Sequence, residues 1–244
     1  MILGIAGREL RSLFLSPLAW ILMSVSMLLL AWLFLVRLEE FIQLQPRLAA
    51  LENAPGITAI LVAPQFGSAA MVLMLIVPVL CMGLFARELS SGTFSLLLSS
   101  PVSVTQIVLG KYLAVLALLG ILLLLIVLMP LSLLVGGKLD LGTLAACILG
   151  LALLLAAYGA VGLYFSSLTR QPAIAAVSSY GALLLLWVLD LAGGGLFSYL
   201  GMSGHFQRLT SGLVFSSDML YFMLLTGLCL TLAVRRLDTL RTFG

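Results

Sequence analysis

The chain has 244 residues, of which 63% are hydrophobic and only 9% are charged, and its formal net charge is +3. A soluble domain needs a charged, hydrated surface around its core, and this composition leaves too few charged residues to make one. A protein that uses the lipid bilayer as its solvent is therefore expected. The small positive charge forms no basic stripe and no recognition motif, which excludes a nucleic-acid partner.

Residues 1–16 mix apolar side chains with Arg8, Glu9, Arg11 and Ser12. This pattern is typical of a helix that lies in the membrane interface. Ser16-Pro17 is expected to end the helix, because proline disfavours helix in the residue before it and fits the first turn of the next helix. The apolar stretch that follows is too long for the core of a signal peptide, so we expect it to remain as the first membrane span.

Six apolar segments are long enough to span a membrane, which requires about 20 residues because lipid offers the backbone no hydrogen-bond partner. They cover residues 17–36, 65–86, 112–135, 143–165, 172–191 and 218–234. An even number of spans places both termini on one side. We predict an all-α polytopic membrane protein whose residues 1–244 form a single transmembrane domain.

The basic residues predict the orientation, because lysine and arginine are retained on the cytoplasmic side. With the N terminus inside, the cytoplasmic segments hold eight of the twelve basic residues. These eight are Arg8, Arg11, Arg87, Lys111, Arg170, Arg235, Arg236 and Arg241. Both termini are therefore expected in the cytoplasm. The longest outer stretch runs from Arg37 to Pro64, and Pro46 and Pro55 are expected to break it into short pieces.

A polar island separates the second span from the third. Its leucines and Phe94 can form the apolar face of a short helix and its serines the opposite face, between Gly92 and Pro101. We predict an amphipathic helix on the cytoplasmic side within the region 87–111. An ordinary loop that touches lipid headgroups remains an alternative on composition alone.

The island reads Arg87-Glu88-x-x-x-Gly92-Thr93-x-x-x-Leu97-Leu98-x-x-Pro101 and is followed by Gly110-Lys111. It resembles the cytoplasmic loop of type-2 ATP-binding-cassette (ABC) exporter permeases. The run Gly204-His205-Phe206-Gln207-Arg208, with Ser217-Asp218 after it, resembles the gliding-motility GldF and NosY-like branch. The resemblance implies a coupling helix that docks on a nucleotide-binding subunit. The contact residues that it implies are Arg87, Glu88, Gly92, Thr93, Phe94, Leu97, Leu98 and Pro101.

The same resemblance implies a set of partners. Two copies of an ABC ATPase subunit are expected, with ATP and Mg²⁺ bound there and no cofactor bound by this chain. A second permease copy or a close paralogue would complete the transporter in a bacterial inner membrane. A GldG-like membrane-anchored protein with a large extracytoplasmic domain is a further expectation. The cargo stays open between lipid-linked or amphipathic molecules, a polysaccharide, a peptide and mechanical work on an outer protein.

The sequence predicts that this chain does not hydrolyse ATP. Gly110-Lys111 and Gly137-Lys138 lack the upstream glycine of a P-loop and the serine or threonine after the lysine. The three cysteines, Cys81, Cys147 and Cys229, fall within predicted spans without CxxC spacing, so packed thiols are expected there rather than a metal site. We therefore expect a non-catalytic subunit.

A stripe of small residues marks the fourth span. Gly159, Gly162 and Ser166 are spaced at i, i+3 and i+7, so they share a helix face that another helix can approach closely. Packing within the chain and a seam between two copies both explain this stripe.

Two other classes of protein compete with the permease. An intramembrane serine protease is suggested by Gly201-Met202-Ser203-Gly204 beside His205, although the histidine lies on the same segment as the serine instead of a later helix. A secondary transporter or channel requires charges inside the spans, and Asp190 lies about 27 Å along its helix, near the outer boundary. The outer side offers a candidate gate formed by Asp190, His205, Phe206 and Asp218.

Overall fold

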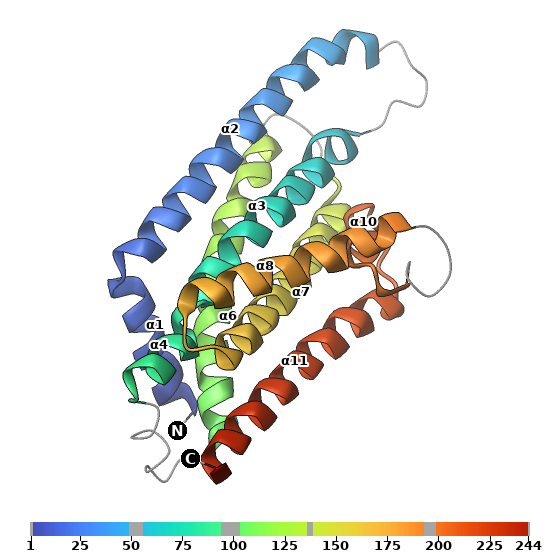
Figure 1. The fold of residues 1–244 in the computed structure, drawn as a ribbon. Helices are drawn as coiled ribbons and strands as arrows, with labels where there is room; N and C mark the ends of the chain where they lie inside the picture. The colour runs from blue at the N-terminus through green and yellow to red at the C-terminus, as the bar shows by residue number, and fades with distance from the viewer. Residues whose placement is uncertain (1, 49–55, 94–102, 136–138, 193–198, 244) are drawn as a thin grey trace.

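The computed structural model describes residues 2–48, 56–93, 103–135, 139–192 and 199–243, and the regular structure in these ranges is helical throughout (Figure 1). The α-helices are α1 (Ile2–Leu15), α2 (Pro17–Leu48), α3 (Ala63–Cys81), α4 (Gly83–Ser91), α6 (Val104–Leu131), α7 (Leu141–Leu168), α8 (Pro172–Val188), α10 (Met202–Thr210) and α11 (Ser216–Phe243). Short helical turns η1 (Thr58–Val62), η2 (Ser132–Val135) and η3 (Leu189–Ala192) flank α3, α6 and α8.

Five helical stretches of the described chain are long and apolar enough to cross a membrane. They are Pro17–Pro46, Thr58–Ser91, Val104–Leu134, Leu141–Leu168 and Ser216–Leu240. The predicted fifth span, 172–191, corresponds to the 17-residue helix α8 followed by η3. Seventeen residues rise about 26 Å, which is shorter than a hydrocarbon layer of about 30 Å. The all-helical prediction is confirmed, but six spans are not: the described residues contain five candidate spans, and the predicted fifth span is the shorter helix α8.

Several predicted span ends are wrong, because the helices continue past the apolar segments. The prediction that Pro46 breaks the outer stretch is wrong: α2 extends through it to Leu48. Pro46 removes one backbone hydrogen bond from this last turn, and α2 ends two residues after it. The last span is also longer than the predicted 218–234, since α11 begins at Ser216 and continues to Phe243. Pro55 lies outside the described residues.

The predicted N-terminal helix and the turn at Ser16 are both present. Ser16 separates α1 from α2 and keeps turn-like bonds, from its own N–H to Leu13 and from Ala19 to its carbonyl. The helix α1 packs against α6, where Ile5 lies so close to Gly110 that a Cβ atom at this glycine would stand 2.7 Å from it. Both chain termini lie at the same end of the bundle (Figure 1), called here the terminal end, and the other is called the opposite end.

Helix α7 is the centre of the bundle and contacts α3, α4, α6, α8, α10 and α11. Its small residues allow close approach: Gly159 faces Val115 of α6, and a Cβ atom at Gly162 would stand 2.7 Å from Cβ of Cys81 in α3. The fully buried Tyr158 accepts a hydrogen bond from Trp187 of α8 at 2.7 Å. These contacts make α7 the helix against which the others are positioned.

Ser166 of α7 occupies the break between α3 and α4. The helix is interrupted at Met82, and the hydroxyl of Ser166 donates to the carbonyl of Met82 at 3.0 Å. The same oxygen accepts the backbone N–H groups of Phe85 at 3.0 Å and Ala86 at 3.2 Å. A hydroxyl offers one donor and two acceptor sites, so this one is saturated. Backbone groups freed by the break therefore find partners without water.

Substituting Ser166 tests whether this hydroxyl holds the break. The Ser166→Ala variant leaves one buried carbonyl and two buried N–H groups without this partner. We expect it to lower the free energy of unfolding by at least about 2 kcal/mol, measured by thermal unfolding in detergent. The matched control is Ser179→Ala: Ser179 is equally buried, but its hydroxyl bonds only to Ala175 of its own helix. An equal loss in both variants would contradict the role given to Ser166.

Candidate functional site

Helix α4 presents two different faces at the terminal end. Leu84, Phe85 and Ala86 are buried, whereas Arg87 and Ser90 are exposed. The helix ends at Gly92, whose φ of 72° is left-handed, a conformation that glycine adopts without the steric penalty of a Cβ atom. A left-handed residue thus ends the helix directly after its exposed, polar residues.

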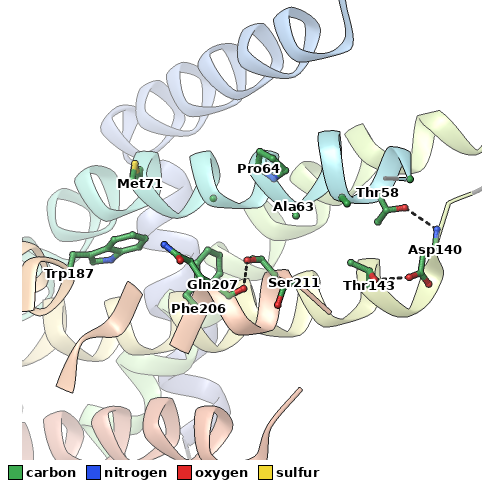
Figure 2. Close-up of a pocket in the computed structure, with 14 residues that line it drawn as sticks. Thr58, Ala63, Pro64, Met71, Asp140, Thr143, Trp187, Phe206, Gln207 and Ser211 are labelled. Atoms are coloured by element: carbon green, nitrogen blue, oxygen red, sulfur yellow. Dashed lines mark hydrogen bonds between the residues drawn. The ribbon is translucent and has the colours of Figure 1, made fainter. Parts of the chain in front are cut away.

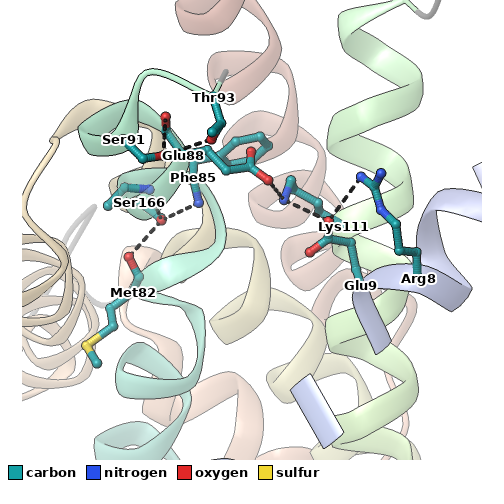
Figure 3. A network of polar contacts seen from close by, with 10 residues as sticks. Arg8, Glu9, Met82, Phe85, Glu88, Ser91, Thr93, Lys111 and Ser166 are labelled. Carbon is teal, nitrogen blue, oxygen red and sulfur yellow. Dashed lines mark hydrogen bonds and ion pairs between the residues drawn. The ribbon is translucent and has the colours of Figure 1, made fainter. Parts of the chain in front are cut away.

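A buried lysine joins α4 to two other helices (Figure 3). The Nζ atom of Lys111 in α6 lies 2.8 Å from Glu88 Oε1 in α4 and 3.2 Å from Glu9 Oε1 in α1. Only 2% of the Lys111 side chain is exposed, while Arg8 reaches Glu9 from the surface at 3.6 Å. The ammonium group also lies 5.2 Å from the centre of the Phe85 ring. One cation therefore ties α1, α4 and α6 together.

Only one of the two carboxylate oxygens of Glu88 has a partner among the described residues. Its Oε1 atom pairs with Lys111, but its Oε2 atom is buried and has no hydrogen-bond partner among the described residues. The sequence predicted Glu88 as a contact for a soluble partner, and the structure shows it engaged inside the chain. Sequence reasoning missed the pairing with Glu9. The sequence did contain a signal for an ion pair: Lys111 is a single charge near the start of an apolar helix, and a charge in that position needs a partner.

The predicted coupling region 87–111 does not form one element. Arg87 and Glu88 belong to α4, while the first turns of α6 take up the end of the region. Ser103 caps α6: its hydroxyl accepts the N–H of Gln106, and the Gln106 side chain accepts the N–H of Ser103. This reciprocal arrangement is a capping box, which explains why the third long helix begins earlier than predicted. The other predicted contact residues, Phe94, Leu97, Leu98 and Pro101, lie outside the described residues.

The small-residue stripe of the fourth span faces the chain itself. Gly159 packs against α6, Gly162 against Cys81, and Ser166 bonds to the break after α3. All three positions are thus occupied by contacts within this chain. Of the two interpretations left open by the sequence, the contacts support packing within the chain.

At the opposite end, Asp218 of α11 is fully buried and paired. Its Oδ1 atom lies 2.6 Å from Arg208 Nη2 and 2.6 Å from His205 Nδ1. Arg208 Nε adds bonds of 3.2 Å to both carboxylate oxygens, and these hydrogen bonds raise the pKa of Arg208. Tyr221 stacks on the His205 ring, with ring centres 4.2 Å apart. The cluster joins α10 to α11.

The two ring nitrogens of His205 contact different groups. Nε2 lies 3.0 Å from the carbonyl oxygen of Tyr199, which only accepts, so Nε2 must carry a hydrogen. Nδ1 lies between Asp218 and Arg208 Nη2, at 2.6 and 2.7 Å. The ring is thus held from both sides, by Asp218 and Arg208 at one nitrogen and by the Tyr199 carbonyl at the other.

The predicted gate residues are close neighbours, but they form two groups. His205 and Asp218 belong to the buried cluster. Asp190 in η3 accepts a hydrogen bond from Ser203 at 2.8 Å, and Phe206 packs against Trp187 with ring centres 6.4 Å apart. The Ser203 hydroxyl thus bonds to Asp190, and both nitrogens of His205 contact other groups. This geometry does not provide the serine–histidine pair that a serine protease requires.

The paired charges of the described chain lie near the helix ends. Lys111 is at the start of the third turn of α6, Asp218 in the first turn of α11, and Asp190 in the turn after α8. No group of three potential metal-ligating residues, counted over the described ranges, is close enough to hold an ion. The ion pairs of these residues tie helices together near their ends.

The fold and these polar ends define a multi-pass helical membrane protein. A family model described as "ABC-2 family transporter protein" matches residues 45–232, which is more than half of the chain. The chain therefore belongs to the ABC-2 family of transporter membrane proteins, and this membership implies an ABC transport permease, typically a non-catalytic subunit that works with a separate ATPase. A search among curated proteins found no match.

The network at the terminal end predicts a large effect of removing Lys111. The Lys111→Met variant leaves the carboxylates of Glu9 and Glu88 facing each other without a cation. We expect a loss of about 3 kcal/mol in the free energy of unfolding in detergent. The control is Arg8→Met, which removes the 64%-exposed partner of the same Glu9 and should change stability by less than about 1 kcal/mol. Equal effects would show that Lys111 is not the centre of the network.

The cluster at the opposite end predicts a partial rescue. Arg208→Met leaves the buried carboxylate of Asp218 with His205 alone, and we expect it to lower the free energy of unfolding by about 3 kcal/mol. Adding Asp218→Asn removes the uncompensated charge, so the double variant should unfold at a higher temperature than the single one. A double variant no more stable than Arg208→Met would contradict the ion-pair interpretation.

Proposed function

We propose that the chain is the membrane-spanning permease subunit of an ABC exporter, driven by ATP hydrolysis on a separate nucleotide-binding subunit. The family supports the permease role, and the observation that carries the coupling is the construction of α4. This helix presents exposed polar residues at the terminal end and is tied internally through Ser166 and Glu88. A soluble subunit can displace membrane helices only through an element that is both accessible and anchored in this way.

The terminal end is proposed to face the cytoplasm. It carries five exposed arginines, Arg8, Arg11, Arg87, Arg235 and Arg236. Such an excess of basic residues is retained on the cytoplasmic side of inner membranes. This orientation supports a bacterial inner-membrane location with both termini inside, and it puts α4 within reach of an ATPase that carries ATP and Mg²⁺.

Docking is proposed to involve the exposed end of α4 and the segment that follows it. Arg87 and Thr93 contribute from the described part, and Phe94, Leu97, Leu98 and Pro101 from the segment 94–102. Glu88 is assigned a different part: it holds α4 to Lys111, so that a displacement of α4 acts on α6 and α1. The same displacement acts directly on α7, because Ser166 of α7 is hydrogen-bonded to Phe85 of α4 and to Met82 just before it.

The assembly is proposed to contain two permease chains and two ATPase subunits. The second permease is another copy of this chain or a close paralogue. Membership of the GldF and NosY-like branch, with a GldG-like extracytoplasmic partner, rests on the resemblance of residues 204–218. Under that proposal the work done is either export of a cargo or mechanical work on the outer partner.

The first experiment is purification of the tagged chain from its native membranes in mild detergent, with the co-purifying proteins identified by mass spectrometry. We expect a stoichiometric P-loop ATPase. Thr93→Arg, an exposed substitution beside α4, should reduce the bound ATPase about tenfold, since a single disrupted interface residue costs more than 1 kcal/mol. Thr239→Arg makes the same change at an exposed position of α11 and should leave the ATPase bound.

The outcomes separate the competing functions. If the wild-type chain purifies without a P-loop ATPase, a secondary transporter or another ATP-independent role is favoured over the permease. If the ATPase is bound equally by wild type and Thr93→Arg, the permease role holds and the docking surface lies elsewhere than at the end of α4.

A further inference from the structure

A cavity of about 650 Å³ opens at the opposite end of the bundle (Figure 2). One wall is formed by η1 and the first half of α3, and the other by the start of α7 together with α10; Trp187 at the end of α8 also lines it. Binding sites for small molecules have volumes of about 300–1,000 Å³. The cavity therefore has the size of a site for one drug-sized molecule.

The lining of this cavity changes in polarity along its length. Met71, Trp187 and Phe206 lie at one end, and Thr58, Asp140 and Thr143 at the other (Figure 2). Phe206 is only 1% exposed, so most of the accessible apolar surface at this end belongs to Trp187 and to Met71, which is 58% exposed. A ligand that matches this lining has an apolar body and a polar head.

Asp140 supplies the single charge among the described residues that line the cavity. It caps α7: one carboxylate oxygen accepts the N–H of Gly142 at 2.9 Å and the other the hydroxyl of Thr143 at 2.6 Å. The hydrogen bond from Thr143 contributes most, and together these bonds lower the pKa of Asp140. The carboxylate is therefore ionised at neutral pH. The side chain is exposed, and a carboxylate has about four acceptor sites, so it can pair with a ligand while it caps the helix.

We propose that this cavity binds a cationic amphiphile, with its charged head at Asp140 and its apolar body against Met71, Trp187 and Phe206. The charge of Asp140 selects the sign of the head, and the aromatic rings bury the body. This site lies at the end away from α4. The proposal names a ligand chemistry for the permease, and binding to the site does not depend on an ATPase.

Gly67 gives a way to fill the cavity without disturbing the bundle. It lines the cavity from α3, and a Cβ atom built on it meets no atom within 4 Å. Gly67→Leu therefore extends a side chain into the space that the ligand would occupy. Gly120 of α6 is exposed, is likewise open around its Cβ position and does not line the cavity. Gly120→Leu is the matched control, since both changes replace a helical glycine by the same residue.

Binding can be measured through Trp187 in the purified full-length chain. Of the three tryptophans, Trp20 and Trp32 are 54% and 67% exposed on α2, and replacing both by Phe leaves Trp187 as the sole indole fluorophore. The probe is ω-bromododecyltrimethylammonium, whose bromine quenches indole fluorescence. We expect saturable quenching that is lost in Gly67→Leu and kept in Gly120→Leu. Quenching that is linear in probe concentration and equal in both variants indicates partition into the detergent alone and overturns the proposal.

The sign of the charge is tested by two further comparisons. ω-Bromododecyl sulfate has the same chain with an anionic head and should bind at least about fivefold more weakly. Asp140→Asn keeps a good helix cap but removes the charge, so it should weaken the cationic probe about two- to fivefold and leave the anionic probe unweakened. Equal affinities for the two probes in the wild type would overturn the assignment of a cationic ligand.

A third arm distinguishes a membrane lipid from a free amphiphile as the source of the head group. Phosphatidylethanolamine with brominated chains is zwitterionic, and it presents its ammonium group beyond the phosphate of a two-chain lipid. Saturable quenching by this lipid that is lost in Gly67→Leu would identify a lipid occupant, and quenching by the single-chain probe alone would identify a free amphiphile. Neither result requires the ATPase, so failure of this proposal leaves the permease role untouched.

Discussion

The hydroxyl of Ser166 sets the geometry on which the terminal end depends. In a lipid environment every backbone group must find its partner within the protein, and a helix that breaks at Met82 frees several of them. One hydroxyl from α7 satisfies three of these groups. Because Gly162 lets Cys81 approach closely just before the break, α3 and α7 are near enough for this to happen. The direction of α4, and with it the position of Glu88, follows from this arrangement.

The two polar ends of the molecule are linked by one rigid element. Helix α7 contacts α4 at the terminal end and α10 at the opposite end, and its 28 residues span about 42 Å. The ion pairs tie neighbouring helices at each end: Lys111 joins α1, α4 and α6, and Asp218 joins α10 to α11. Between the ends the helices pack through buried apolar side chains, with single hydrogen bonds such as that from Trp187 to Tyr158. A displacement applied to α4 therefore acts on the same helix that lines the cavity at the far end.

The helical class of the fold, the turn at Ser16 and the location of the long helices were predictable from the sequence. They depend on local apolar content and on proline, both of which are visible in a single chain. The ends of the helices were not predictable, because counting apolar residues detects neither a cap such as the Ser103–Gln106 pair nor the continuation of α2 through Pro46 to Leu48.

The contacts of the polar site were not predictable from the sequence. Glu88 was predicted as a contact for a soluble partner, which stays a prediction, and its pairing with Lys111, 23 residues away, and with Glu9 on another helix through that lysine was missed. The His205–Asp218 pair was likewise two residues of one predicted gate without a predicted bond. Pairings of this kind depend on which helix faces meet in space, and helical periodicity alone does not determine that.

The position of Lys111 between two carboxylates has a consequence for any movement of α4. A buried ammonium group with a single partner would be stranded by the loss of that partner, at a cost of several kcal/mol. Here two carboxylates share the ammonium group, so a displacement of α4 would act through Glu88 on Lys111 and through Glu9 on α1 while the cation keeps a counter-ion. The second oxygen of Glu88 has no hydrogen-bond partner among the described residues, so the ion pair with Lys111 is the contact by which this side chain holds α4 to the bundle.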